Sequence, residues 1–180
     1  MPERRLDSDA PLAEAPAVVS RLRVRYAETD QMGVAYHANY LVWMEVGRTD
    51  YCRACGLAYR DLEAAGIRLV VAEARARYQA AARYDDALRI ETRLTVLRSR
   101  QIGFAYAIYR EDDNALLATG ETLHLPTDAQ GRAMRLPAEA RRALSSLRGA
   151  GDERQATRAP GARTGAVRRR ASLLAGGGCA

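Results

Sequence analysis

Four stretches in the second half of the chain alternate apolar and polar residues with a period of two, and this pattern restricts the possible folds most. The alternation covers residues 70–78, 88–96, 102–108 and 115–125. Successive side chains of a strand point to opposite faces, so a period of two over such lengths is typical of half-buried antiparallel strands. The run Asp112, Asp113 and Asn114 predicts a hairpin turn between the last two strands.

A long, mostly apolar stretch lies ahead of these strands. Residues 38–55 are predicted to form a helix, and Gly56 suits the position just after its end. A helix this apolar must be wrapped by something. Gly47 costs about 1 kcal/mol relative to alanine, so we expect close approach of another backbone there, such as a partner's helix. The polar residues of the helix cluster on one side: Glu45, Arg48, Thr49 and Arg53.

The order of the elements favours an α+β fold. A strand over residues 21–27 precedes the long helix, a short helix over 59–65 follows it, and a closing helix is predicted over 137–147. The simplest arrangement of these elements is an antiparallel sheet that wraps around the long helix. One helix covers only one face of a sheet, so the charged residues of the other face are expected to meet solvent or a second subunit.

The two ends of the chain differ in composition from this domain, which spans residues 20–148. Residues 1–19 are expected to be a disordered leader, and the Gly-, Ala- and Arg-rich residues 149–180 a disordered tail. Residues 148–180 hold seven arginines and two acids, and thus most of the net charge of +6. The basic charge therefore belongs to a tail and not to a folded face, although a polybasic arm for nucleic acid or membranes stays an alternative.

Several protein classes are disfavoured by composition. Three cysteines imply no disulfide framework and favour a reducing cytoplasm. The first twenty residues lack the apolar core of a signal peptide, and no apolar run approaches the roughly 18 residues of a membrane span. We therefore expect a soluble, cytoplasmic protein.

Cys52 and Cys55 form a C-x-x-C that closes the long helix, where buried packing is expected instead of redox chemistry. His124 is expected to be structural.

Residues 25–40, which join the first strand to the long helix, carry the densest group of reactive side chains. The helix is expected to begin near His37 or Ala38, and its first N–H groups have no intrahelical partner, so they can bind a developing oxyanion. Asp30 lies in the loop approaching that end and can act as a general base or a nucleophile. From spacing alone, an alternative stays open in which Asp30 and Asn39 only cap turns and His37 is a satisfied polar residue. His37 and His124 are the sole histidines, and no ligand spacing predicts a metal site.

This segment resembles the 4-hydroxybenzoyl-CoA thioesterase family, especially its Tol–Pal-associated acyl-CoA thioesterase branch. The resemblance covers about residues 20–147, and it departs from the family at Ala81, where the family usually has proline. The matching residues are Arg25-Tyr26, Glu28-Thr29-Asp30, Met32-Gly33, Tyr36-His37, Asn39-Tyr40, Glu45, Arg48, Tyr78 and Ala82-Arg83-Tyr84-Asp85-Asp86.

The resemblance implies a hotdog fold, a five-stranded antiparallel sheet wrapped around a long central helix. It implies dimers, often paired into tetramers, with active sites at subunit interfaces, and neither a metal nor a bound cofactor. The catalytic carboxylate falls on Asp30 and the amide that polarises the thioester carbonyl at or near His37, whose imidazole is also implicated. The substrate-binding residues are expected to be Tyr26, Gly33, Val34, Asn39, Tyr40 and Glu45.

Arg98 and Arg100 flank Ser99 between two predicted strands, where they either hold the phosphates of coenzyme A or form a solvated turn. Hydrolysis of an acyl-CoA thioester is the favoured function. A hotdog-fold hydratase or dehydratase and a non-catalytic acyl-CoA-binding protein are the alternatives. The acyl group stays open, because a pocket between subunits cannot be measured from one sequence.

Overall fold

The structure of this chain is a computed structural model that describes the backbone of residues 16–156 and the side chains of residues 16–147. The segments 1–15 and 157–180 lie outside the described residues. In chain order the elements are β1 (Val18–Arg23), a 3₁₀ turn (Tyr26–Glu28), α1 (Asn39–Ala54), α2 (Tyr59–Ala64), β2 (Arg68–Tyr78), β3 (Ala87–Arg98), β4 (Gln101–Arg110), β5 (Leu116–Thr127) and α3 (Ala138–Ala156).

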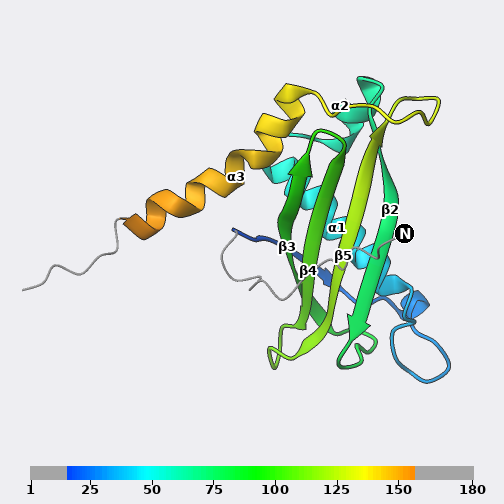
Figure 1. The fold of residues 1–180 in the computed structure, drawn as a ribbon. Coiled ribbons are helices and arrows are strands. Elements are labelled where there is room, and N and C mark those ends of the chain that lie inside the picture. The colour runs from blue at the N-terminus through cyan, green and yellow to red at the C-terminus, as the bar shows by residue number, and fades with distance from the viewer. Residues whose placement is uncertain (1–15, 157–180) are drawn as a thin grey trace, which may run out of the picture.

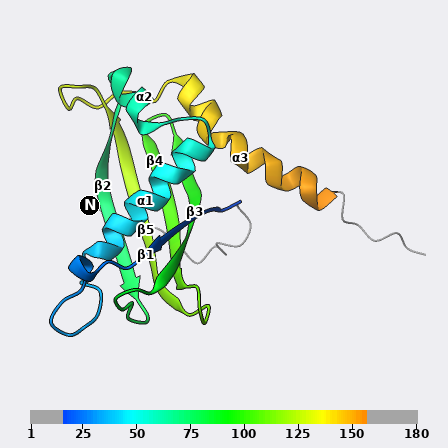
Figure 2. The ribbon, with the colours of Figure 1, turned by 180° about the vertical axis from the view of Figure 1, so that it is seen from behind.

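The five strands form one antiparallel sheet in the order β1-β3-β4-β5-β2. Figures 1 and 2 show α1 lying across one face of this curved sheet, with α3 extending away from one end. The predicted α+β hotdog arrangement is therefore confirmed. β1 and β2 are the edge strands, and both pair on one side only.

The core lies between α1 and the inner face of the sheet. Trp43, Met44 and Tyr51 project from α1 and are almost fully buried. Helix and sheet approach so closely that a side chain at Gly47 would collide with Thr92 of β3. The expectation that a partner's backbone explains Gly47 was therefore wrong, because β3 of the same chain fills that place. A side chain at Gly120 of β5 would likewise collide with Met44.

The helix is less completely wrapped than its sequence predicted. Arg48, assigned to the polar side, is 7% exposed, whereas Leu41, Val42 and Val46 are 41%, 46% and 37% exposed. The reason is that the sheet curves around one side of α1 only, and the side chains of β2 are exposed along almost its whole length. Within the described residues, α1 and β2 thus share an uncovered surface that includes apolar side chains.

Two element boundaries differ from the prediction. β1 begins at Val18, inside the expected leader, and ends at Arg23, because Arg25 and Glu28 cap a 3₁₀ turn that draws the chain out of the sheet. α3 continues to Ala156, beyond the predicted end at residue 147 and into the expected tail. The rest of the expected leader and tail, residues 1–15 and 157–180, is outside the described part of the chain. No helix in residues 16–156 is both long and apolar enough to cross a membrane.

Candidate active site

The loop that carries Asp30 is closed by its own backbone hydrogen bonds. The N–H of Asp30 donates to the carbonyl of Val34 at 2.9 Å, and the N–H of Tyr36 donates to the carbonyl of Glu28 at 2.8 Å. Gly33 has a φ of +72°, which favours glycine, and its N–H donates to Asp30 O at 3.0 Å. The loop therefore has a defined shape at the start of α1, where Figure 1 shows it in blue.

A buried carboxylate, Glu28, ties this loop to the helix. Its oxygens accept hydrogen bonds from the Arg25 backbone N–H at 2.8 Å, the Arg25 guanidinium at 2.7 Å and the Trp43 indole N–H at 3.1 Å. Burial disfavours the charged form, but these donors outweigh it and lower the pKa of Glu28. The sequence marked Glu28 only as part of the family motif. The acid three residues after Arg25, at a strand end, was the signal for a capping role.

The Asp30 carboxylate is held on one side and free on the other. Its Oδ1 accepts a hydrogen bond from the N–H of Met32 at 2.8 Å. Its Oδ2 contacts no donor among the described residues, and the side chain is partly exposed. A carboxylate oriented through one oxygen, with the second open, has the geometry of a general base or a nucleophile.

The start of α1 presents free amide groups. The N–H of Asn39 donates to Tyr36 O at 2.9 Å and closes a turn whose two central residues are His37 and Ala38. Within residues 16–156, the N–H groups of His37 and Ala38 have no acceptor. These are orphan donors of a helix start, and both residues are exposed, so the predicted amide at His37 is available to a carbonyl oxygen.

Aromatic rings surround this helix start. The Tyr36 ring lies 4.3 Å from the His37 ring, and the Tyr78 ring of β2 lies edge-on at 6.5 Å from it. The Tyr78 hydroxyl donates to the backbone carbonyl of His37 at 3.1 Å. Since Tyr36 and Tyr78 are each 48% exposed, both rings border open space beside the helix start.

The other expected substrate-binding residues divide into two kinds. Tyr40 is 3% exposed and its hydroxyl accepts the Ala82 N–H at 3.1 Å, so it supports the loops from within the core. Asn39 is also a support, because its side-chain amide donates to Glu28 O at 2.8 Å. Tyr26 is 78% exposed and packs edge-on against Tyr84. Val34 contributes a backbone carbonyl to the loop, as described above.

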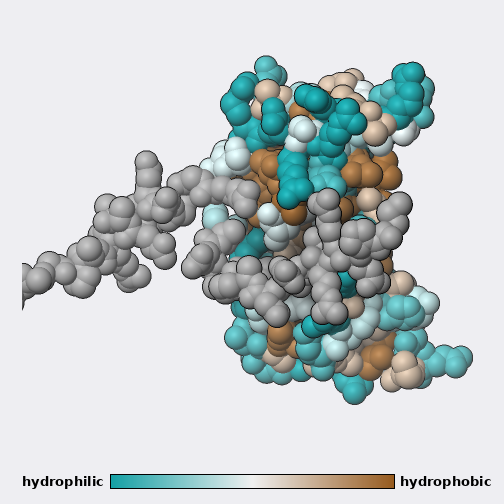
Figure 3. Space-filling model, viewed as in Figure 1, coloured by the Kyte–Doolittle hydropathy of each residue, from teal (hydrophilic) through white to brown (hydrophobic). Residues whose placement is uncertain are grey.

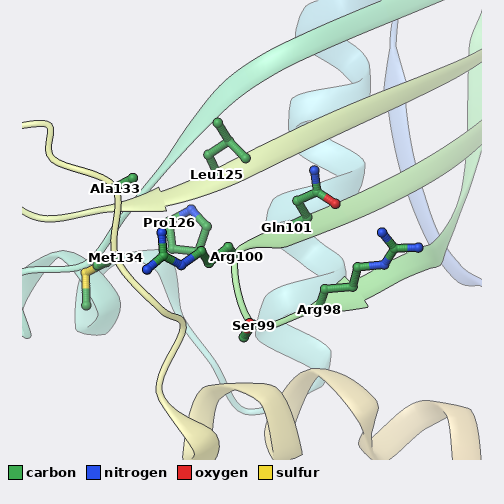
Figure 4. A pocket seen from close by; sticks show the side chains of 8 residues that line it. All are labelled: Arg98, Ser99, Arg100, Gln101, Leu125, Pro126, Ala133 and Met134. Atoms are coloured by element: carbon green, nitrogen blue, oxygen red, sulfur yellow. The ribbon is translucent and has the colours of Figure 1, made fainter. Parts of the chain in front are cut away.

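Arg98 and Arg100 lie at the opposite end of the sheet. They line a pocket of about 290 Å³ beside the β3–β4 turn, together with Leu125, Pro126 and Met134; Figure 4 shows this lining. β4 begins at Gln101, beside the two arginines. It stops at Arg110, near the Asp30 end of the sheet. Ten residues of strand at ~3.3 Å each separate the two ends by about 30 Å. In one chain, the arginines and Asp30 are not brought together.

A buried polar cluster lies behind the arginine end. Arg48 donates to Nε2 of His124 at 3.2 Å, and this nitrogen also lies 2.9 Å from the hydroxyl of Thr122. His124 has no exposed surface, and burial together with the nearby Arg48 charge lowers its pKa to about 4. Glu45 is the carboxylate nearest to Arg48 among the described residues, at 3.9 Å, and its side chain is 65% exposed. His124 therefore packs in the core in its neutral form.

The fold also shows how the two cysteines of α1 and its end are buried, and whether side chains could group around a metal ion. Cys52 and Cys55 are buried as free thiols, and burial raises the pKa of Cys52 to about 12, which suits packing and not redox chemistry. Within the described part of the chain, no three His, Cys, Asp or Glu side chains are grouped so that they could hold a metal ion.

Known proteins resemble this chain over most of its described length. The model of the Thioesterase-like superfamily matches residues 24–144. "Putative acyl-CoA thioesterase YneP" of Bacillus subtilis is 41% identical over 88 residues, which cover 49% of this chain and 64% of YneP, slightly less than two thirds of its length. Acyl-CoA thioester hydrolase YbgC of Escherichia coli is 36% identical over 107 residues, covering 59% of this chain and 79% of YbgC.

A solved structure extends the likeness to three dimensions. The DHNA-CoA thioesterase of Staphylococcus aureus superposes with a TM-score of 0.71 at 29% identity, covering 76% of this chain and 94% of that chain.

Proposed function

Because the chain belongs to the thioesterase-like superfamily, we propose that it is an acyl-CoA thioesterase that hydrolyses a CoA thioester to a free acid and CoA. One observation carries the proposal. The open Oδ2 of Asp30 and the free N–H groups of His37 and Ala38 belong to one hydrogen-bonded loop and helix start. A base and an oxyanion donor are the two elements that thioester hydrolysis requires.

In the proposed reaction, the thioester carbonyl oxygen accepts a hydrogen bond from the N–H of His37. Asp30 removes a proton from water, whose oxygen attacks the carbonyl carbon, or its own oxygen attacks first and water then hydrolyses the acyl-enzyme. The C–S bond breaks as the oxyanion collapses, and the thiolate takes up a proton to give CoA. The exposed imidazole of His37 lies where it could orient the substrate or assist the leaving thiolate.

The arginine pocket is proposed to hold the phosphates of CoA. Arg98 and Arg100 are exposed and form no ion pair with any described residue, and guanidinium groups suit phosphate geometry. About 30 Å separates them from Asp30 of the same chain. This separation and the exposed apolar side chains of α1 support an active site completed between subunits of a homodimer or homotetramer. We place the enzyme in the cytoplasm.

The Asp30→Asn variant tests the proposal. The amide oxygen can still accept the Met32 N–H, so the loop keeps its shape while the base is lost. We expect release of thiol from a panel of acetyl-, octanoyl-, palmitoyl- and benzoyl-CoA to fall by about 10²–10⁴ in kcat. Asp112→Asn removes the same charge from an exposed turn and should retain wild-type turnover. A folded Asp30→Asn protein with undiminished turnover would remove Asp30 from the mechanism, and no turnover by the wild type would remove the function.

A further inference from the structure

The peptide group between His37 and Ala38 has an unusual partner. Its carbonyl accepts a hydrogen bond from the hydroxyl of Tyr78 at 3.1 Å and a longer one from the N–H of Tyr40 at 3.3 Å. The N–H of the same peptide group is that of Ala38, which has no acceptor among the described residues. A side chain from the sheet therefore donates to one side of a peptide whose other side is a free donor at the helix start.

The Tyr78 ring is held by the sheet and by two neighbouring rings. Tyr78 is the last residue of β2 and pairs with Ala118 of β5, so the sheet sets its backbone position. Its ring meets the Tyr40 ring at 5.1 Å and 79°, in the edge-on geometry that aromatic pairs prefer. Tyr40 is itself buried and hydrogen-bonded to Ala82, and the ring of His37 lies edge-on to Tyr78 at 6.5 Å. The hydroxyl is therefore held against the His37 carbonyl although the residue is half exposed.

The Ala38 N–H is suited to the same task as that of His37. Ala38 has helical dihedral angles, φ −66° and ψ −25°, and His37 precedes it in the same turn. Successive N–H groups of a helix start point along the helix axis in similar directions, so both face the same space. A hydrogen bond to the carbonyl of a peptide polarises that peptide and strengthens its N–H as a donor.

We propose that the Ala38 N–H is a second donor to the thioester oxyanion, and that Tyr78 is the positioning residue that orients and polarises it. The proposal rests on the proposed function, because it assumes that an oxyanion forms at the start of α1. Tyr78 does not touch the substrate in this role. It acts through the peptide, and its contribution appears only when negative charge develops on the carbonyl oxygen.

The test replaces the Tyr78 hydroxyl and keeps its ring. In Tyr78→Phe, we expect kcat for the CoA thioester that the wild type hydrolyses fastest to fall roughly 3- to 10-fold, with KM changed by less than about twofold. Tyr109→Phe is the matched control. Its hydroxyl has no partner in the described part of the chain and its ring stacks on Arg89 of β3, so kcat should not change. Equal kcat values for the two variants and the wild type would overturn the proposal.

A second measurement separates polarisation from simple support. 3-Fluorotyrosine and 3,5-difluorotyrosine at position 78 keep the hydrogen bond but make the phenol a progressively stronger donor. At a pH where both phenols stay protonated, we expect kcat to rise with fluorination while KM stays constant. A kcat that is flat or falls across this series would overturn the proposal. If kcat is flat or falls with fluorination while Asp30→Asn abolishes turnover in the same assays, the result rejects the role of Tyr78 alone. The proposed function is then still supported.

Discussion

The two ends of the sheet satisfy their polar groups in opposite ways. At the helix-start end, the loop of Asp30 is closed by backbone hydrogen bonds and anchored by the buried carboxylate of Glu28. At the other end, the arginines around the β3–β4 turn and the start of α3 are exposed, and their guanidinium groups form no ion pair or hydrogen bond with described residues; they are Arg98, Arg100, Arg135, Arg141 and Arg142. In Figure 3, hydrophilic side chains gather at both ends of the visible face.

This difference separates an end whose fixed groups suit catalysis from an end whose free charges suit ligand binding. Fixed donors and a fixed carboxylate need no reorganisation when charge develops on a substrate, and this favours catalysis. Unpaired guanidinium groups in an open pocket attract an anion without fixing its position closely, and this favours binding. Changes at the first end should therefore lower kcat, and changes at the second end should raise KM.

After Asp30→Asn, the largest expected effect comes from removing one amide hydrogen. In His37→Pro the N–H is lost, whereas the fixed φ of proline suits the first central position of the turn that His37 occupies. We expect kcat to fall by about 10²–10³. His37→Ala keeps the N–H and loses only the imidazole, so it should lose less. If the alanine variant is as slow as the proline variant, the imidazole and not the amide is the main contribution of this residue.

The second effect concerns the interior behind the arginine end. The pKa of His124 is about 4 in the folded protein and about 6.5 in the unfolded chain, so the unfolded chain binds more protons between these pH values. Folding stability should therefore fall as the pH drops from 6.5 to 4, by about 3 kcal/mol in total from this residue. Urea unfolding across this range measures it. His124→Gln should give a shallower dependence, and parallel curves for the two proteins would contradict the assignment.

The smallest effect tests the arginine end itself. In the double variant Arg98→Gln and Arg100→Gln, we expect KM for a CoA thioester to rise roughly tenfold with kcat unchanged, because exposed charge contacts contribute modestly. An N-acetylcysteamine thioester lacks the phosphates, so its KM should not change. Arg60→Gln is the control for one lost charge, since it removes a positive charge from an exposed residue outside the pocket. A fall in kcat with constant KM would contradict the expectation that the arginine end acts in binding and not in catalysis.

The sequence predicted the fold well where local patterns decide the structure. Period-two alternation located β2 to β5, and the apolar run with Gly56 located α1. The sequence assigned Arg48 to the polar side of α1 although it is buried, because periodicity cannot tell which side of an apolar helix the sheet will cover. The end of β1 was missed because Glu28, three residues after Arg25, was read only as part of the motif and not as the cap of a turn.

The candidate site divides in the same manner. The motif identified Asp30 and the free amide of His37, because a helix start and a preceding acid can be recognised from local order. The role of Tyr78 could not be deduced in this way. Tyr78 lies 41 residues from His37 in the chain and reaches it only through the pairing of β2 with β5. The distance between Asp30 and Arg98 likewise depends on strand length and not on any motif.

The close fit of α1 on the sheet at two glycines has a mechanical consequence. Because Gly47 leaves room for Thr92, and Gly120 leaves room for Met44, helix and sheet are keyed to each other at two points. The helix cannot slide or roll on the sheet without breaking this fit. The segment between Gly47 and His37 is ten residues long, which is about 15 Å. A small shift of α1 relative to the sheet at Gly47 would therefore displace the amide groups at the start of the helix.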